Sequence, residues 1–332
     1  MIPRRFWPAF IAVPLALLAL VAGVLWLLPS DYYIVLPDRA RPVDPLVSVP
    51  GESKDVRTAG VYMVDVRVGR ASLFERFFPS VHEGATLIPE RALNPAGVSD
   101  TERRRSSLNE MTLSQKVAVT VALREVGRTV AVRSSGAEVV LVLPDAPASG
   151  TLEIGDVIVE AEGHEIRSTD DLMQAMKPVR PGSRVSFVVR REGKRVPVTL
   201  GTRADPRDAA HAVVGIQVQD AKSFSFPLDV TIDTPGIGGP SAGLAFALDI
   251  VDELGRDIDR GRTVVATGEL SLDGTVSAIG GVHQKVIGAR DAGADLFLVP
   301  RANAAEARKY ADGLRIVPVS TFDGALASLA TG

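Results

Sequence analysis

The segment Gly236-Ile237-Gly238-Gly239-Pro240-Ser241-Ala242-Gly243 constrains the fold of this chain most, because it joins a strand-like run to an apolar, helix-like run. Residues 229–233 (DVTID) read as a strand, and residues 241–254 are mostly apolar and end before Gly255. Pro240 suits the first turn of a helix, and the glycines let a second backbone approach closely. The segment therefore predicts a loop that carries Ser241 to the N-terminus of a helix.

Three other interpretations of this loop are open. A phosphate-binding loop needs G-x-x-x-x-G-K-[ST], but the Gly193-Lys194 pair lacks the first glycine and is followed by Arg195. The nucleophile elbow G-x-S-x-G fits residues 239–243, yet it needs a strand that runs directly into the serine and a downstream acid and histidine, and His283 is the only later histidine. A plain glycine-rich helix cap is the third.

The residues that follow contain a candidate base for the serine. Residues 263–267 read as a strand, Asp273-Gly274 is a strong hairpin signal, and Gly280-Gly281 leads into a helix over residues 282–292. His283 and Lys285 are two apart on this helix, so only one of them can face Ser241. A serine needs a neighbouring base to become a nucleophile, and a lysine can serve if burial lowers its pKa.

The N-terminus carries a run without charge from Phe6 to Leu28, roughly 34 Å long as a helix. Tryptophans lie near both ends, and Arg4 and Arg5 precede the run, which predicts a membrane helix with a cytoplasmic N-terminus and the rest of the chain outside. A cleaved signal peptide is the alternative, although its apolar region would be shorter.

The next 100 residues are less regular. Residues 37–54 read as an extended connector, and residues 60–68 (GVYMVDVRV) alternate as one strand. Residues 111–126 have helical spacing and stop at Gly127, whereas residues 90–107 are polar and predict a loop. The basic cluster Arg103-Arg104-Arg105 is interpreted as a solvated patch.

Short β-branched runs broken by turn residues begin at Val139 and indicate a small β-rich module. They include D-A-P-A-S-G from Asp145 and L-E-I-G-D-V-I-V-E-A-E-G-H-E-I from Leu152, then a helix over residues 169–176 and two strands around Glu192-Gly193. This succession resembles a PDZ domain over roughly residues 128–203. PDZ domains bind an extended peptide as an added strand, but residues 135–138 (SGAE) place an acid where the carboxylate-binding loop needs an apolar residue, so recognition of carboxyl termini stays open.

Residues 234–300 closely resemble the proteolytic domain of the Lon proteases. The shared motifs are G-P-S-A-G, T-G-E-L-S-L, G-T-V, G-G-V-H-Q-K and the A-G-A-D-L-F-L-V-P strand, which begin at Gly239, Thr267, Gly274, Gly280 and Ala292. The order and the spacing of all five agree with the family.

The resemblance assigns roles to individual residues. It implies that Ser241 is the nucleophile, that Lys285 is the general base, and that Thr267 hydrogen-bonds the lysine, with Glu269 as a supporting acid. Backbone groups that would meet the oxyanion or the substrate belong to Gly238, Gly239, Ala242, Gly280 and Gly281. Gly238 stands where most Lon enzymes have an acid, which is a departure from the family.

The anchor, the PDZ-like module and the catalytic motifs together resemble the membrane-anchored, ATP-independent Lon-like proteases of Gram-positive bacteria, as does M-x-x-S-Q from Met111. This resemblance implies an α+β protease domain into which the PDZ domain is inserted. Because relatives of the catalytic domain often form rings, it also implies a homo-oligomer. The predicted segments are a tail (1–5), a transmembrane helix (6–28), a connector (29–59), the first protease part (60–127), the PDZ domain (128–205) and the catalytic part (206–332).

These observations predict a serine endopeptidase that cleaves peptides or flexible protein segments outside the cytoplasm without ATP. The alternative is a membrane-tethered PDZ adaptor whose Lon-like domain is inactive or regulatory. A net charge of -3 without a long basic run argues against nucleic acid, and the missing phosphate loop argues against nucleotide. The four histidines are scattered without metal-ligand spacing and the chain has no cysteine, so no metal or cofactor is expected.

Overall fold

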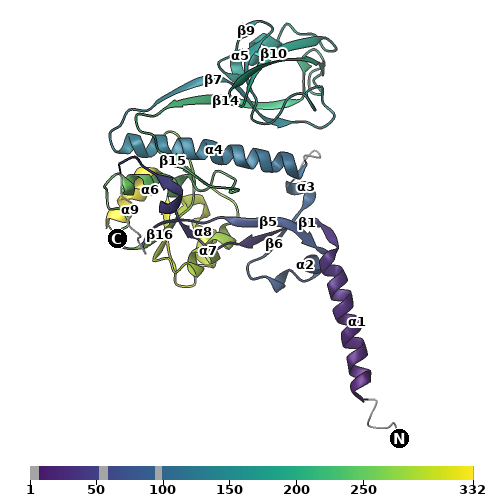
Figure 1. Ribbon diagram of the computed structural model, residues 1–332, viewed down its shortest axis with the longest axis vertical. Helices are drawn as coiled ribbons and strands as arrows, with labels where there is room; N and C mark the ends of the chain where they lie inside the picture. The colour runs from purple at the N-terminus through teal and green to yellow at the C-terminus, as the bar shows by residue number, and fades with distance from the viewer. Residues whose placement is uncertain (1–6, 52–58, 94–98, 332) are drawn as a thin grey trace.

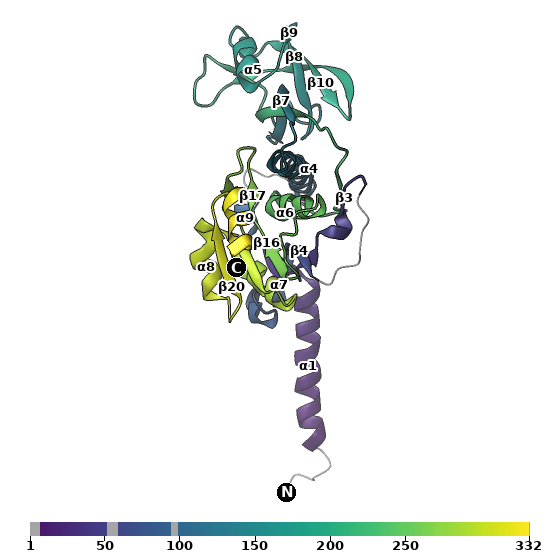
Figure 2. The same ribbon diagram turned by 90° about the vertical axis from the view of Figure 1, so that its left-hand side faces the viewer.

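The structure is a computed structural model that describes residues 7–51, 59–93 and 99–331, with side chains from Val13 onward. Helix α1 (Trp7–Leu27) projects from a mixed α/β body, and a small β-rich domain lies at the opposite side of that body (Figure 1; Figure 2). Within the described residues, no helix combines the length and the apolarity that crossing a bilayer requires. Arg4, Arg5 and the predicted tail lie outside those residues.

A five-stranded sheet forms the centre of the body, in the order β2-β4-β16-β19-β20. Four of its strands are parallel, and only β2 runs antiparallel to its neighbour. The strands are β2 (Arg41–Pro42), β4 (Gly60–Met63), β16 (Thr263–Ala266), β19 (Leu296–Pro300) and β20 (Arg315–Val319). The residue that follows β16 is Thr267, so the predicted site lies at the carboxyl ends of parallel strands, where open α/β sheets place their ligands.

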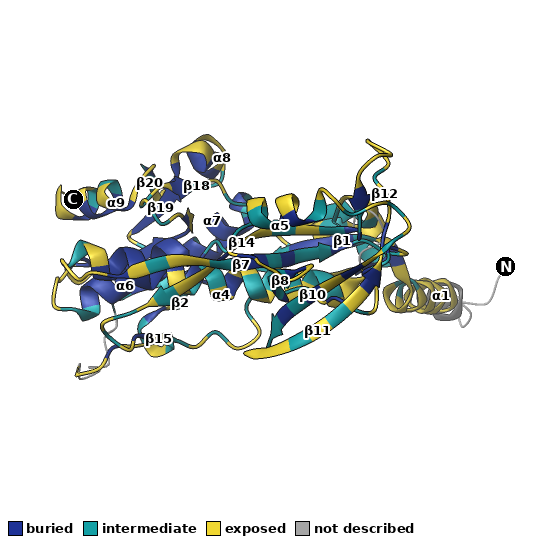
Figure 3. Cartoon of the chain, turned by 90° about the horizontal axis from the view of Figure 1, so that it is seen from above, coloured by how far each residue is buried: buried dark blue, intermediate teal, exposed yellow. Residues whose placement is uncertain are grey.

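Helices cover both faces of this sheet because its apolar residues alternate in direction. Val264 and Ala266 belong to the core beneath α6 (Gly243–Glu253) and α4 (Asp100–Glu125), whereas Val265 belongs to the core beneath α7 (Val282–Asp291) and α8 (Ala304–Lys309). Helix α6 is buried between α4 and the sheet, as the dark blue ribbon shows (Figure 3). The last helix, α9 (Phe322–Thr331), packs on the α6 side.

A second, three-stranded sheet has the order β5-β1-β6 and is built from β1 (Pro29–Pro37), β5 (Val66–Ser72) and β6 (Thr86–Pro89). Part of the predicted connector therefore forms a central strand with buried residues, including Tyr33 and Ile34. The single strand predicted over residues 60–68 is wrong, because the chain turns at Val64-Asp65 and enters a different sheet. Short helices α2 (Leu73–Phe77) and α3 (Glu90–Leu93) follow β5 and β6.

The loop predicted over residues 90–107 is also wrong where the structure describes it. Helix α4 begins at Asp100, because Ser99 and Glu102 form a reciprocal capping box with each other's backbone N–H groups. The predicted helix from Met111 is the second half of this longer helix, and residues 94–98 lie outside the described part. The basic cluster of Arg103 to Arg105 therefore lies on the first turns of α4.

The small domain has its own sheet and its own core. The sheet order is β11-β10-β8-β7-β14, with β9 paired to β8. Its elements are β7 (Ala131–Val142), β8 (Val157–Ala161), β9 (His164–Glu165), α5 (Thr169–Met176), β10 (Arg184–Arg191), β11 (Lys194–Gly201) and β14 (Ile216–Ser225). The predicted helix over residues 169–176 and the two strands around Glu192-Gly193 are confirmed.

Three two-residue pairs complete the fold. They are β3 (Val47–Ser48) with β15 (Thr231–Ile232), β12 (Arg203–Ala204) with β13 (Ala212–Val213), and β17 (Glu269–Leu270) with β18 (Val276–Ser277). The hairpin predicted around Asp273-Gly274 is confirmed, and so is the helix that begins at Val282. The strand expected over residues 229–233 is only two residues long, and it ends well before Ser241, so no strand runs directly into the serine as the nucleophile elbow requires.

Candidate active site

The glycine-rich loop delivers Ser241 to the start of α6 and is fixed on helix α4. The Gly239 N–H donates to the Ser107 carbonyl at 2.8 Å, and the Ser114 hydroxyl donates to the Pro240 carbonyl at 2.9 Å. A Cβ on Gly238 would lie 2.3 Å from the Ser107 hydroxyl oxygen. The close approach of α4 therefore leaves no room for the acid that most Lon enzymes carry at this position.

Lys285 meets Ser241 from the other side of the sheet. Its Nζ lies 2.7 Å from the Ser241 Oγ and 3.1 Å from the Thr267 Oγ1. The Thr267 hydroxyl donates in turn to the Ser241 carbonyl at 3.1 Å, which commits its proton and leaves its oxygen to accept from the lysine. Three separate segments, the loop before α6, the end of β16 and helix α7, thus form one hydrogen-bonded group.

Burial changes the acidity of Lys285. The side chain is 3% exposed, and desolvation lowers its pKa from 10.5 to about 8, while the negative charge of Asp65 acts in the opposite direction. At neutral pH about a tenth of such lysines are therefore uncharged, against fewer than about one in a thousand for an ordinary lysine. An uncharged amine beside a serine hydroxyl can act as a general base.

His283 does not compete for this role. Its ring stacks on Tyr310, with 3.6 Å between the ring centroids. The two-residue spacing sends His283 and Lys285 to different sides of α7, as expected for a helix.

The remaining predicted residues lie in three different places. Ala242 caps α6 next to the serine, whereas Gly281 caps α7 in the left-handed conformation and accepts the Lys285 N–H. Gly280 precedes that cap and has open space where a Cβ would be. Glu269 is exposed on β17, and among the described contacts it hydrogen-bonds neither Lys285 nor Ser241.

The backbone amides beside the nucleophile are not committed by the hydrogen bonds of the described residues. Among the hydrogen bonds of the described residues, none uses the N–H of Ser241 or Ala242, whereas the Gly239 N–H is committed to Ser107. Free N–H groups at the start of a helix can stabilise a negatively charged oxygen.

Asp65 is a functional candidate that the sequence reasoning missed. It lies in the turn between β4 and β5, close enough to affect the pKa of Lys285, and both of its carboxylate oxygens accept from Arg41 at 3.0 and 3.1 Å. The alternation over residues 60–68 predicts one strand and gives no sign of the turn that carries Asp65. Ser107 belongs to a polar stretch that predicts a loop, so its contact with Gly239 could not be predicted either.

Helix α7, which carries Lys285, is tied to the N-terminal segments. The Gln284 amide donates to the Gly84 carbonyl at 2.6 Å and to the Thr86 hydroxyl at 2.8 Å. The Ala40 N–H donates to the Gly288 carbonyl at 3.0 Å, and a Cβ on Gly288 would lie 2.0 Å from the Asp38 carbonyl oxygen. Residues 38–40 and 84–86 thus help to place the lysine.

The edge that a PDZ domain offers to peptides is already occupied in this structure. The predicted carboxylate-binding residues lie inside β7, where Ala137 pairs with Ile158 of β8 on one side and with Asp220 of β14 on the other. The Asp220 carboxylate also accepts from the N–H and the hydroxyl of Thr169 at the start of α5. A peptide could add to β7 only by displacing β14.

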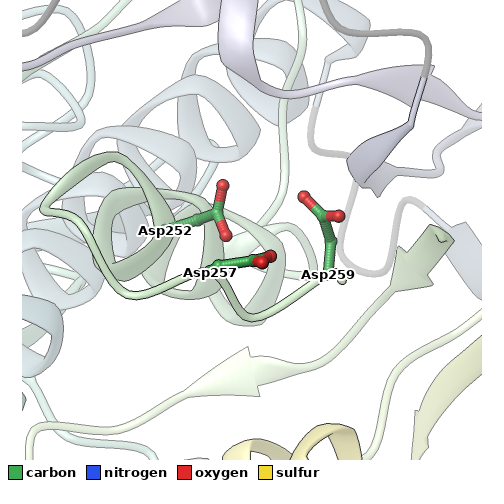
Figure 4. Close-up of side chains that lie close together, drawn as sticks. All are labelled: Asp252, Asp257 and Asp259. Carbon is green, nitrogen blue, oxygen red and sulfur yellow. The ribbon is translucent and has the colours of Figure 1, made fainter. Parts of the chain in front are cut away.

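Asp252 in the last turn of helix α6, with Asp257 and Asp259 just after it, places three carboxylates within 4.8 Å of one another (Figure 4). Each accepts a backbone N–H of the same turn, from Ile258, Arg260 and Gly261 respectively. These hydrogen bonds account for the close spacing of the carboxylates. The turn lies at the end of α6 opposite Ser241.

Comparison with known proteins supports two domains in this chain. Residues 226–331 match the Lon protease (S16) C-terminal proteolytic domain, and residues 120–202 match the PDZ domain. The chain is 41% identical to Lon protease 2 of Bacillus subtilis (strain 168) over 101 residues, which are 30% of this chain and 18% of that protein. It is 28% identical to Lon protease 1 of Sorangium cellulosum over 238 residues, 70% of this chain and 28% of that protein.

The chain thus spans less than a third of the length of these curated relatives. The crystal structure of the PDZ domain of an SdrC-like protein from Listeria monocytogenes is 24% identical, covers 25% of this chain and 87% of that structure, and has a TM-score of 0.24. The family matches confirm the coarser part of the sequence interpretation. The chain combines a PDZ domain with a Lon-type proteolytic domain, and the match to the proteolytic domain supports serine peptidase activity.

Proposed function

We propose that this protein is a serine endopeptidase in which Ser241 is the nucleophile and Lys285 is the general base. The observation that carries the proposal is the 2.7 Å contact between the Lys285 Nζ and the Ser241 Oγ, with the lysine buried and its pKa lowered to about 8. Ser241 also lies within the residues that match the Lon-type proteolytic domain.

The reaction follows from this geometry. When Lys285 is uncharged, its lone pair accepts the Ser241 proton as the oxygen attacks the peptide carbonyl, and the resulting ammonium then protonates the leaving amine. Thr267 holds the Nζ in line with the serine through its 3.1 Å contact. The N–H groups of Ser241 and Ala242 stabilise the oxyanion, because they adjoin the nucleophile and make no hydrogen bond among the described residues. Water then releases the acyl group by the same proton transfers.

The test is cleavage of an unstructured protein by the full chain and its variants. Ser241→Ala and Lys285→Ala should each lower kcat/KM by at least about 10³-fold. Ser149→Ala and Lys309→Ala change an exposed serine and an exposed lysine elsewhere and should cleave as the wild type does. Wild-type activity in either site variant would refute Ser241 and Lys285 as the catalytic pair. The alternative function, a membrane-tethered PDZ adaptor, would then be the one to test.

We also propose that the chain is anchored in the cell membrane by residues 6–28, with its catalytic and PDZ domains outside the cytoplasm. The support is the charge-free N-terminal run with its preceding arginines. The protein should resist extraction from membranes by alkaline carbonate, and protease added outside intact cells should digest it. Release by carbonate, or protection from that protease, would contradict the arrangement.

Cleavage by this chain should not depend on ATP, because the sequence has no phosphate-binding loop. Without an unfolding step, the substrates should be short peptides or flexible segments of folded proteins. Adding magnesium and ATP to the cleavage assay should leave kcat/KM unchanged, and a stimulation would contradict this part of the proposal.

A further inference from the structure

A cavity of about 580 Å³ lies between the two domains and reaches the catalytic loop. One wall is a single face of α4, which presents Asn109, Glu110 and Leu113, and the opposite wall is the pair of strands β7 and β14. Pro240, next to the nucleophile, and Glu269 with Leu270 of β17 also line it. The cavity therefore extends to the residue that precedes Ser241.

The charges on the cavity wall have one sign. Among the described residues that line it, the charged ones are all glutamates, namely Glu110 of α4, Glu138 of β7 and Glu269 of β17. Glu138 is held by the Gln219 side chain at 3.2 Å, whereas partial burial, and then repulsion from Glu269, raises the pKa of Glu110. Seven apolar residues share the wall: Leu113, Val117, Val140, Leu141, Ile154, Pro240 and Leu270.

We propose that this cavity binds the part of the substrate next to the scissile bond and selects a lysine or arginine side chain there. A basic side chain suits both parts of the wall, because its methylene stem packs on apolar groups while its charged end reaches the carboxylates. An acidic side chain would meet only repulsion. The inference rests on the proposed protease function and adds a specificity to it.

The cavity also gives the PDZ domain a role that needs no free sheet edge. Strands β7 and β14 supply Glu138, Gln217 and Gln219 to the cavity wall with the face of their sheet. The pairing of β14 with β7 thus has two effects: it occupies the edge of β7, and it forms one wall of the cavity. In this arrangement the PDZ domain forms one side of the substrate channel.

The test uses the full chain and pairs of peptides that differ at one position, with lysine in one member and the uncharged norleucine in the other. The position is moved stepwise along eight residues around the cleavage site. At one or more positions the wild type should favour lysine in kcat/KM by on the order of tenfold, and added salt should reduce that ratio.

Variants then locate the preference. Glu110→Gln and Glu138→Gln should each bring the lysine-to-norleucine ratio closer to one, and Glu110→Lys should favour a peptide with glutamate at that position. Glu306→Gln, on the exposed surface of α8, is the matched control and should keep the wild-type ratio. The ratio is taken within each variant, so a general loss of activity does not affect it.

The outcomes distinguish a failure of the cavity proposal from a failure of the protease function on which it rests. If wild-type cleavage depends on Ser241 but shows no lysine preference at any position, or if the glutamate variants keep the wild-type ratio, the cavity proposal is wrong and the protease proposal stands. If no peptide is cleaved in a Ser241-dependent way, the protease proposal itself fails.

Discussion

At the scale of single residues, the chemistry depends on whether Lys285 is charged. Its pKa of about 8 makes the uncharged form scarce at pH 7 and predominant at pH 9. We expect kcat/KM to rise about tenfold between pH 7 and pH 9, with an inflection near pH 8. A peptide without ionisable side chains should be used, so that the profile reports the enzyme. A flat profile over this range would contradict the role of Lys285.

Asp65 should set the position of that inflection. Its negative charge raises the pKa of Lys285, so Asp65→Asn should move the inflection to lower pH. Arg41 would keep its contact with Asp38 but lose the Asp65 charge, and a less compensated positive charge nearby acts in the same direction. The comparison is Asp208→Asn, an exposed carboxylate of the β12–β13 connection, which should leave the profile in place. A shift to higher pH would refute the assignment.

The same burial predicts a stability cost. Because the folded pKa of about 8 lies below the ordinary 10.5, the unfolded chain binds the proton more tightly, and the cost is complete below pH 8 and fades between pH 8 and 10.5. Lys285→Met should therefore raise the free energy of unfolding by about 1–3 kcal/mol at pH 7 and by less at pH 10. Urea denaturation of this variant and of the exposed-site variant Lys309→Met measures the difference. An equal or lower stability of Lys285→Met at pH 7 would contradict the cost.

The sequence predicted part of this site and missed the rest for a clear reason. Ser241, Thr267 and Lys285 each follow a local signal, namely a glycine loop, the end of a strand and a glycine-capped helix. Asp65, Ser107 and Ser114 act through contacts with segments more than 100 residues away, and no local pattern carries that information.

At the scale of elements, the placement of helix α7 depends on a glycine. Alanine usually stabilises a helix interior relative to glycine by about 1 kcal/mol. Here a Cβ on Gly288 would lie 2.0 Å from the Asp38 carbonyl oxygen, so the helix would have to move away from that segment. We expect Gly288→Ala to lower the free energy of unfolding by about 1–3 kcal/mol and to lower kcat as Lys285 shifts.

A second helical glycine separates the clash from a general effect of alanine. Gly324 lies in α9, where the nearest atom to an added Cβ is the Thr321 hydroxyl at 3.1 Å. Gly324→Ala should leave kcat unchanged. A Gly288→Ala protein that is as active and as stable as the wild type would show that α7 does not depend on the contact with residues 38–40.

Elements with strong local signals were predictable, and those defined by distant partners were not. The Asp273-Gly274 hairpin and the helix α5 formed as expected, and Ser168 caps α5. The S-x-x-E signal of Ser99 and Glu102 was present in the sequence, and applying it would have predicted the start of α4. The pairing of β14 with β7 has no such local signal, because its partners lie about 80 residues apart.

At the scale of the whole molecule, the two domains have separate hydrophobic cores. Phe187 lies in the core of the PDZ domain, whereas Phe246 lies in the core shared by α4, α6 and the central sheet. We expect two unfolding transitions in calorimetry. Phe187→Ala should lower one and Phe246→Ala the other, each by about 3–5 kcal/mol of unfolding free energy. A single transition that both variants shift equally would show that the domains unfold together.

The central claim is that burial beside Ser241 leaves Lys285 with a pKa near 8. The most direct measurement is an NMR titration of lysines labelled with ¹³C at the ε carbon, with the Lys285 signal assigned by its loss in Lys285→Met. We expect this signal to titrate near pH 8, well below the 10.5 that is ordinary for a lysine side chain. A Lys285 signal that titrates near 10.5 would contradict the claim.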